Sequence, residues 1–324
     1  MRKQILAGLL VLMLLVTSFA GCAVPRKPPE KPEVKSITHR WGEVTSEAAE
    51  VLTTIIVYNP NPFILPVRKV FCDISLAGVK VGHGETQGVR MKAMGDFPIN
   101  IATEIQAEKI PEFWAEHLRH GEVSEILLKG GVVFDLFITT FTFPFQLKRT
   151  LRTNLLSTLR ITKPISFSPF GENIPFRLVI KSVSAEWGEV TKEKTELILL
   201  AVIYNDSPFT ISIPEELLSK ALYYEVLLNE IPLGIEGKLA ESYRFLANSD
   251  TRVKVILTLD NTPMGKWFLS HIRNGERSII KVKVHFVFDL PPEMAKVVGK
   301  NKLEIPLYQV EQEFETDLLG SKAK

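Results

Sequence analysis

The sequence has 324 residues, 45% of them hydrophobic and 23% charged, so it is long enough for two ordinary domains or one large one and is not disordered by composition. Its 39 basic and 37 acidic residues leave a formal net charge of +2, which gives no electrostatic reason to expect a nucleic-acid partner. With only two cysteines, Cys22 and Cys72, a disulfide framework and a cysteine-based metal site are excluded.

Residues 1–22 have the three parts of a lipoprotein-type signal peptide. Arg2 and Lys3 precede an apolar run over 5–19, and small residues follow it. The sequence Phe-Ala-Gly-Cys that ends at Cys22 is similar to a prokaryotic lipobox, whose cysteine carries a lipid, so we expect lipid attachment there. An uncleaved membrane anchor and soluble secretion remain open, because the uncharged stretch is also about long enough to span a bilayer. All three alternatives place the body of the protein outside the cytoplasm, since the basic residues stay inside.

Residues 23–34 predict an extended tether. They hold four prolines among charged residues, and proline-rich chain favours polyproline II geometry with about 3.1 Å per residue. Such a segment would hold the first domain about 30–40 Å from the membrane. The prolines are Pro25, Pro28, Pro29 and Pro32.

Residues 35–156 predict seven short strands. Alternation of apolar and polar side chains, as between Phe97 and Ile105, is typical of an antiparallel strand with one face on a core. A hairpin turn is expected near Ala77-Gly78. Seven strands separated by turn signals favour an antiparallel β-sandwich of the immunoglobulin or fibronectin-III type. The strands are expected near 35–45, 50–58, 69–77, 79–87, 97–105, 123–135 and 140–148.

The second of these strands ends abruptly in Asn59-Pro60-Asn61-Pro62-Phe63. Proline cannot donate to a strand ladder, so the two prolines end the pairing and fix the register of the strand. The asparagine side chains are able to bond backbone groups that are freed at the break, and the phenylalanine is able to return to the core. We interpret the motif as structural, with a partner-binding role for the turn left open.

One short helix is predicted over 109–121. Its apolar side chains recur at helical spacing, and Gly121 provides a C-terminal stop. The apolar positions are Ile110, Phe113, Trp114 and Leu118.

The segment 134–147 concentrates five phenylalanines. We interpret it as part of the core and of a contact between domains. If these side chains are exposed instead, they form the first surface on which to look for an apolar ligand or a membrane.

Several motifs return about 150 residues later in the same order, and a period of this length indicates that a whole domain was duplicated. Trp-Gly-Glu-Val-Thr occurs at 41–45 and 187–191, and the helical segment at 113–122 matches 267–276. The Asn-Pro-Asn-Pro-Phe motif returns as Asn-Asp-Ser-Pro-Phe, which keeps Asn205, Pro208 and Phe209.

The repeat sets the predicted domain organisation. We expect a first sandwich over 35–156, a semi-rigid connection over 157–179, a second sandwich over 180–319 and a tail over 320–324. Each sandwich is expected to carry one short helix and to close its own hydrophobic interior.

An apolar strand ending in Asn-Pro-Asn, a following hairpin that contains Val-Lys-Val-Gly-His-Gly at 79–84, and then an alternating strand resemble the WHy (water stress and hypersensitive response) domain. This domain belongs to the group-two late embryogenesis abundant proteins. The resemblance covers 37–155 and 180–319, and the second copy departs from it at 205–209. It implies a fibronectin-III-like β-sandwich with one helix, a link to desiccation or stress tolerance, and no catalytic residues.

The histidines give the only hint of site chemistry. His117 and His120 are three residues apart on the predicted helix, with Glu116 and Glu122 nearby, so a metal site is conceivable. We interpret them as a solvated helix surface, because the second copy keeps a histidine at only one of the two positions. Motifs of metalloproteases, serine hydrolases and nucleotide-binding loops do not occur. We therefore expect no catalytic residue, metal site or cofactor.

Together these features predict a non-enzymatic, membrane-tethered extracytoplasmic protein with tandem WHy domains, acting as a desiccation- or stress-related binding or structural module. The alternative is a carrier that holds a lipid or another apolar ligand between its sheets. The expected partners are the membrane, reached through the N-terminal lipid or anchor, and an unidentified protein or apolar ligand.

Overall fold

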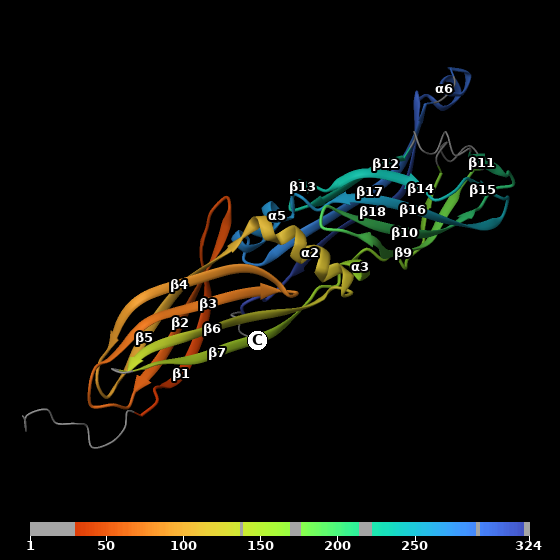
Figure 1. Cartoon of the computed structure of the whole chain (residues 1–324). Coiled ribbons are helices and arrows are strands. Elements are labelled where there is room, and N and C mark those ends of the chain that lie inside the picture. The colour runs from red at the N-terminus through yellow and green to blue at the C-terminus, as the bar shows by residue number, and fades with distance from the viewer. Residues whose placement is uncertain (1–29, 137–138, 169–175, 214–221, 290–291, 321–324) are drawn as a thin grey trace, which may run out of the picture.

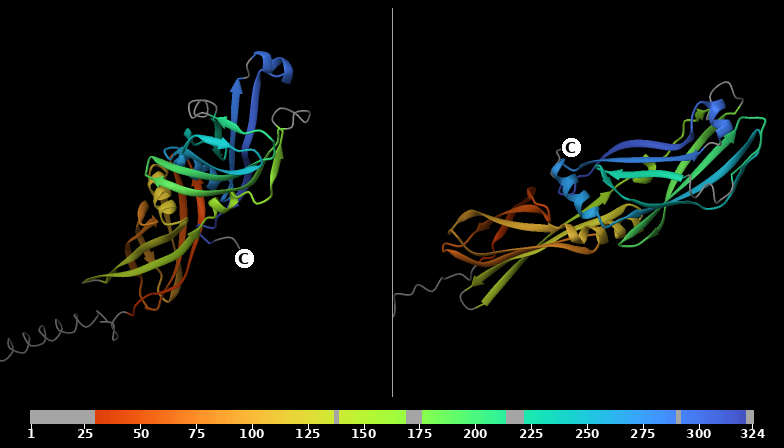
Figure 2. Two further views of the ribbon diagram at one scale, coloured as in Figure 1. Left: turned by 90° about the vertical axis from the view of Figure 1, so that its right-hand side faces the viewer. Right: turned by 90° about the horizontal axis from the view of Figure 1, so that it is seen from above.

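The computed structural model describes residues 30–136, 139–168, 176–213, 222–289 and 292–320. Figure 1 shows two β-sheet units arranged end to end, with two helices between them, and Figure 2 shows the same elongated arrangement from two further directions. None of the helices in the described part of the chain is long and apolar enough to cross a membrane. The predicted all-β fold with short helices is confirmed.

The first unit has the seven predicted strands. They form one antiparallel sheet in the order β1-β2-β5-β4-β3-β6-β7. The strands are β1 (Glu33–Val44), β2 (Ala48–Asn59), β3 (Leu65–Leu76), β4 (Val79–Met91), β5 (Gly95–Gln106), β6 (Val123–Leu136) and β7 (Thr139–Arg152).

β4 and β5 pair only at Gly82 with Ile105 and at His83 with Glu104, so the sheet is held together there by a short seam. Glycine is needed at this seam, because an added Cβ on Gly82 would lie 2.6 Å from the backbone oxygen of Glu104. Gly84 is similarly close to the oxygen of Ala102. The glycines of the Val-Lys-Val-Gly-His-Gly segment therefore allow the close approach of two backbones.

The strand predictions also hold in detail. Ile99, Ile101 and Ile105 are buried along one face of β5, as the alternation predicts. The β3–β4 hairpin turns at Ala77 and Gly78, whose φ angles of 50° and 82° match a two-residue turn with both residues in the left-handed region.

The second unit divides its strands among three antiparallel sheets, in the orders β14-β16-β10-β9-β8, β13-β12-β17-β18 and β11-β15. The strands are β8 (Ile165–Phe167), β9 (Leu178–Val190), β10 (Lys194–Asn205), β11 (Ile211–Ile213), β12 (Leu222–Leu228), β13 (Ile231–Pro232), β14 (Gly234–Leu239), β15 (Tyr243–Phe245), β16 (Ser249–Asp260), β17 (Arg277–Asp289) and β18 (Lys302–Glu315).

The predicted helix and its repeat are both present. Both bury one apolar face, and the described chain also has further short helical segments. The helical elements are η1 (Ala107–Lys109), α2 (Ile110–Arg119), α3 (Leu155–Thr158), α5 (Met264–Arg273) and α6 (Pro292–Val298).

Part of the predicted connection at 157–179 pairs with the second unit. Ile161 forms a β-bridge with Val183, and β8 adds a strand beside β9. Leu159 is fully buried, and its backbone oxygen accepts a hydrogen bond from Tyr308 Oη at 2.7 Å. The described part of this segment is therefore fixed against the second sandwich.

The phenylalanine-rich segment forms the β6–β7 hairpin. Phe134 and Phe145 are buried, and the half-buried ring of Phe141 stacks on Phe134 at 6.4 Å, which agrees with a place in the core. The predicted contact between domains is wrong for this segment. The last residues of β6 and the first of β7 lie at the end of the first unit that faces away from the second unit (Figure 1).

The expectation that each unit closes its own interior is also corrected. The buried hydrophobic side chains of both units form one connected cluster. They are joined because α2 and α5 carry apolar residues into the contact between the units.

Candidate functional site

The contact between the two units is built on the helices α2 and α5, which lie side by side (Figure 1). Trp114 and Trp267 are 6% and 5% exposed, and their ring centroids are 5.2 Å apart at an angle of 60°. Gly265 allows the close approach, because an added Cβ would lie 2.5 Å from the backbone oxygen of Ala107. The two sandwiches therefore meet through an aromatic contact at which the helices come close to each other.

Around this contact, the tryptophan of each Trp-Gly-Glu-Val-Thr copy binds the glutamate that follows the helix of the other unit. Trp41 Nε1 donates to Glu276 Oε1 at 2.8 Å, and Trp187 Nε1 donates to Glu122 Oε1 at 3.1 Å. The arrangement is pseudo-two-fold, as in an isologous dimer interface.

Two arginines repeat the same crossing pattern. Arg119 donates to the backbone oxygen of Val190 at 2.8 and 3.0 Å, and Arg273 donates to the oxygens of Val44 and Thr45. Sequence reasoning detected the repeated motifs but missed that they bind each other. The occurrence of the same motifs in both copies was the feature of the sequence that could have indicated this contact.

The two glutamates of this interface are buried, with Glu122 4% and Glu276 2% exposed. Glu122 accepts hydrogen bonds from Thr153 Oγ1 at 2.9 Å, Leu155 N at 2.6 Å and Leu156 N at 3.1 Å, besides that from Trp187. Its carboxylate thus binds the first backbone N–H groups of α3. Buried carboxylates are tolerated when they are hydrogen-bonded in this way.

Glu276 repeats these contacts at the end of the second unit. It accepts from Thr316 Oγ1 at 2.8 Å and Leu318 N at 2.6 Å. Both glutamates have left-handed backbone, with φ of 63° for Glu122 and 62° for Glu276, each after a left-handed glycine. The repeated Gly-Glu pair therefore places a carboxylate where a following chain segment and the other unit meet.

His117 is fully buried, so the prediction of a solvated histidine surface is wrong for this residue. Its Nδ1 lies 2.7 Å from Ser124 Oγ and its Nε2 lies 2.8 Å from Thr153 Oγ1. Since the Thr153 hydroxyl donates to Glu122, we assign the proton of the neutral ring to Nε2, with Nδ1 accepting from Ser124. The helix turns this histidine inward because its position shares the apolar face of α2.

His271 in the second unit repeats the arrangement. It is 1% exposed, and its ring nitrogens lie 2.8 Å from Ser278 Oγ and 2.8 Å from Thr316 Oγ1. His120, by contrast, is exposed, and its Nδ1 lies 2.7 Å from the backbone oxygen of Glu116. Within the described residues, no group of histidine, cysteine and carboxylate side chains is arranged to hold a metal ion.

The chain Ser124, His117, Thr153 and Glu122 has the residue types of a proton relay but not the access. Ser124 is 4% exposed, and its hydroxyl is occupied by the histidine. Burial lowers the pKa of His117 to about 4, so the ring is neutral near pH 7. A nucleophile needs an exposed oxygen that a substrate can reach. The network therefore serves to join α2, β6 and β7.

This network predicts that stability falls in acid. The unfolded His117 takes up a proton near pH 6.5, whereas the folded ring does so only near pH 4. The contribution of the neutral His117 to the free energy of unfolding is therefore fully present above about pH 6.5. It decreases by on the order of 3 kcal/mol as the pH falls to about 4. Denaturant titrations from pH 7.5 to 4 should show this decrease, and His117→Gln should reduce it. His120→Ala, which changes an exposed histidine next to the C-terminal end of the same helix, should leave the acid-induced decrease unchanged. If the free energy of unfolding fell equally with pH in the wild type and both variants, His117 would not be its source.

The Asn-Pro-Asn-Pro-Phe motif lies at the opposite end of the first unit. Asn59 is fully buried, and its Nδ2 donates to the backbone oxygens of Phe63 at 2.9 Å and Lys92 at 3.0 Å. Its Oδ1 accepts from the backbone N and the Nδ2 of Asn61. One side chain thus ties the β2–β3 turn to the β4–β5 turn, while Pro60 and Pro62 carry no N–H.

The second unit keeps this arrangement with a substitution. Asn205 Nδ2 donates to the oxygens of Phe209 at 2.7 Å and Phe245 at 3.1 Å, and its Oδ1 accepts from Ser207 at 2.6 Å. Ser207 thus stands where Asn61 does in the first unit. Pro208 is exposed, and Phe209 is 56% exposed rather than returned to the core. Cys22, the predicted lipid attachment site, lies outside the described residues.

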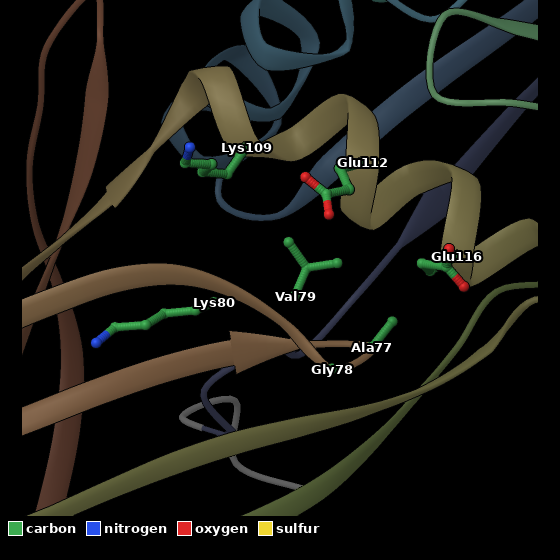
Figure 3. Close-up of a pocket in the computed structure, with 7 residues that line it drawn as sticks. All are labelled: Ala77, Gly78, Val79, Lys80, Lys109, Glu112 and Glu116. Carbon is green, nitrogen blue, oxygen red and sulfur yellow. The ribbon is translucent and has the colours of Figure 1, made fainter.

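A surface hollow of about 460 Å³ lies between α2 and the β3–β4 turn (Figure 3). Lys109, Glu112 and Glu116 line it from the helix side, and Lys80 lies across from them. Lys80 pairs with Asp73 at 2.8 Å, and Glu116 pairs with Arg119. Charges of both signs, largely paired with neighbours, do not indicate a particular ligand.

Comparison with known proteins finds a family similarity within the first unit. Residues 54–149 match the sequence model of the late embryogenesis abundant protein family LEA_2. An uncharacterized protein of Methanocaldococcus jannaschii is 23% identical over 141 residues, which cover 42% of this chain and 76% of that protein.

Two solved structures are also similar. A protein from Archaeoglobus fulgidus has a TM-score of 0.37 at 22% identity, covering 38% of this chain and all of that one. A putative late embryogenesis abundant protein has a TM-score of 0.24 at 14% identity, covering 47% of this chain and 85% of that one.

The fold and the family match together define the class. The protein has an all-β sandwich fold, and residues 54–149 of its first unit are similar to the LEA_2 family.

Proposed function

We propose that this chain is a non-enzymatic, membrane-tethered extracytoplasmic protein in which two WHy-type modules act as one stress-related binding or structural unit. The tether is a lipid on Cys22 or an uncleaved apolar segment. In this proposal the second unit is a WHy module as well, although its turn sequence departs from the motif.

The observation that carries the proposal is the use made of the repeated polar residues. His117, Glu122 and their repeats His271 and Glu276 are buried and hydrogen-bonded within and between the units. Side chains that are able to perform acid–base chemistry are therefore committed to holding two sandwiches together. This supports a rigid module rather than an enzyme, in agreement with the LEA_2 match of the first unit.

Cys22→Ser tests the tether. In a bacterial host the wild-type chain should sediment with membranes and incorporate labelled fatty acid, and the variant should lose the label. Release of the variant into the soluble fraction supports a lipid anchor, whereas its retention in membranes supports an uncleaved anchor. A wild-type chain found only in the soluble fraction would overturn the tether.

The stress role needs a separate measurement. Deleting the gene in its own organism should reduce survival of drying, and restoring either the wild-type chain or His117→Gln should recover survival. Equal survival with and without the gene would overturn the stress-related role. Lipid recovered with the purified chain in native mass spectrometry would favour the alternative of an apolar carrier.

A further inference from the structure

The end of the first unit at which the described chain begins carries exposed apolar side chains. Ile64 in the β2–β3 turn is 57% exposed and Met94 in the β4–β5 turn is 61% exposed. The described chain starts beside them, because Glu30 exchanges hydrogen bonds of 2.8 and 2.9 Å with the Asn61 side chain. We call Ile64, Met94 and the basic residues Arg68, Arg90 and Lys92 the first-unit tip.

Met94 occupies a backbone conformation that does not suit it. Its φ is 51°, in the left-handed region that asparagine adopts readily and that long side chains disfavour. The second unit has Asn248 with φ of 51° at the matching place, since Met94 N donates to Asn61 O and Asn248 N donates to Ser207 O. Likewise Thr210 follows Phe209 where Ile64 follows Phe63. The first unit therefore exposes apolar side chains at two positions where its repeat has polar ones, although the repeat exposes Phe209 and Leu246 elsewhere in the same turns.

The charge around these side chains is mainly basic. Arg68, Arg90 and Lys92 are exposed, and none of them forms an ion pair with a described residue. Lys35 at the same end is paired with the exposed Asp96 at 2.8 Å, and the other exposed acids here are Glu30 and Glu33. Exposed apolar side chains with unpaired basic ones on the adjoining strands and turn match the boundary between acyl chains and anionic headgroups.

The anchoring of Glu30 also shortens the predicted tether. Pairing in β1 begins at Glu33, so only residues 23–29 remain between the lipid site Cys22 and the fixed chain. Seven residues at the polyproline II rise of about 3.1 Å each span roughly 20 Å, so a lipid on Cys22 would keep the tip end of the molecule within that distance of the membrane.

We propose that the first-unit tip docks on the surface of an anionic lipid bilayer, with Ile64 and Met94 inserted at the headgroup level. This inference rests on the proposed membrane tether. The docked end positions the long axis of the two units away from the bilayer, with the second unit outermost.

The test uses the chain that begins at Cys22, which retains every described residue, coupled through Cys22 to maleimide lipid in vesicles. Cys72 is fully buried, and burial raises its pKa to about 11, so it does not compete for coupling. The vesicles contain phosphatidylcholine with or without phosphatidylserine. Hydrogen exchange is measured by mass spectrometry against the same chain coupled to a short polyethylene glycol maleimide.

Backbone amides of 61–65 and 92–95 should exchange at least about fivefold more slowly on phosphatidylserine vesicles, and less so without phosphatidylserine. The matching turn of the second unit, 206–210 and 246–249, serves as the internal control and should not change. The double variant Ile64→Thr and Met94→Asn, which copies the second unit, should lose the protection while keeping or raising its melting temperature.

Equal hydrogen exchange in the vesicle-coupled chain and in the chain coupled to polyethylene glycol would overturn the docking surface. A protein partner would then be the remaining candidate for binding at the first-unit tip. Protection that persists in the double variant would overturn the roles of Ile64 and Met94. Because the coupling replaces the natural anchor, a failure of the proposed tether in cells does not affect this result.

Discussion

Glu122→Ala is expected to lower the free energy of unfolding by about 3–5 kcal/mol. The carboxylate accepts hydrogen bonds from Thr153, Trp187 and the two backbone N–H groups at the start of α3, and it is 4% exposed. Its removal leaves several buried donors without an acceptor, and each such donor costs about 1–3 kcal/mol. Part of the loss falls on the neighbouring His117, since Thr153 links the two residues.

Guanidinium titration followed by far-ultraviolet circular dichroism measures this loss. Glu276→Ala at the repeated position should have a similar effect, because that side chain accepts from Trp41, Thr316 and Leu318 N. Glu112→Ala, on the solvent side of α2, is the matched control and should change stability by less than about 0.5 kcal/mol. A loss at Glu122 no larger than that at Glu112 would show that the carboxylate does not hold the interface.

Trp114→Ala is expected to uncouple the two sandwiches. The side chain is 6% exposed and packs on Trp267 of the other unit, with ring centroids 5.2 Å apart. Truncating a buried aromatic residue costs about 3–5 kcal/mol, and here the resulting cavity lies between the units. The units should then unfold at separate temperatures, and the averaged shape in solution should become more variable.

Differential scanning calorimetry and small-angle X-ray scattering distinguish this result from simple core damage. The wild type should show a single transition and an elongated, rigid scattering profile, whereas the variant should show two transitions. Trp187→Phe, which removes one hydrogen bond across the interface but keeps most of the ring, should cost about 1 kcal/mol and preserve coupling. A destabilised Trp114→Ala that keeps one transition and the wild-type profile would contradict coupling through this contact.

The repeated motifs are explained by this interface rather than by a shared catalytic site. Trp41 and Trp187 belong to the Trp-Gly-Glu-Val-Thr copies, and each binds the glutamate that follows the other unit's helix. A residue retained in two copies of one chain is usually taken as evidence of equal roles within each copy. Here the role is reciprocal, since one unit's tryptophan satisfies the other unit's carboxylate.

The candidate site shows where sequence reasoning stopped. The helix over 109–121 was predictable because four apolar side chains recur at its period, and its structure follows that pattern. The burial of His117 was not predictable from that pattern, because a histidine is polar by composition and becomes buried only when Ser124 and Thr153 satisfy both ring nitrogens. Those partners lie 7 and 36 residues away in sequence, on β6 and just after β7.

The arrangement of the phenylalanine-rich hairpin shows the same limit. Its apolar composition correctly indicated a place in the core. Composition does not indicate, however, which end of a strand lies next to the other unit. The contact between units formed at the other end of the sandwich, where α2 and α5 present their tryptophans.

By itself the sequence determined the all-β class, the strand positions, the central helix and the repetition of motifs, because these depend on side-chain period and on local turn chemistry. The tertiary structure alone decided which repeated residues meet, which histidine is neutral and buried, and which turn exposes Ile64 and Met94. Such pairings join residues that are far apart in sequence, 36 positions for His117 and Thr153 and 235 positions for Trp41 and Glu276, and no local pattern encodes the partner of a side chain at such distances.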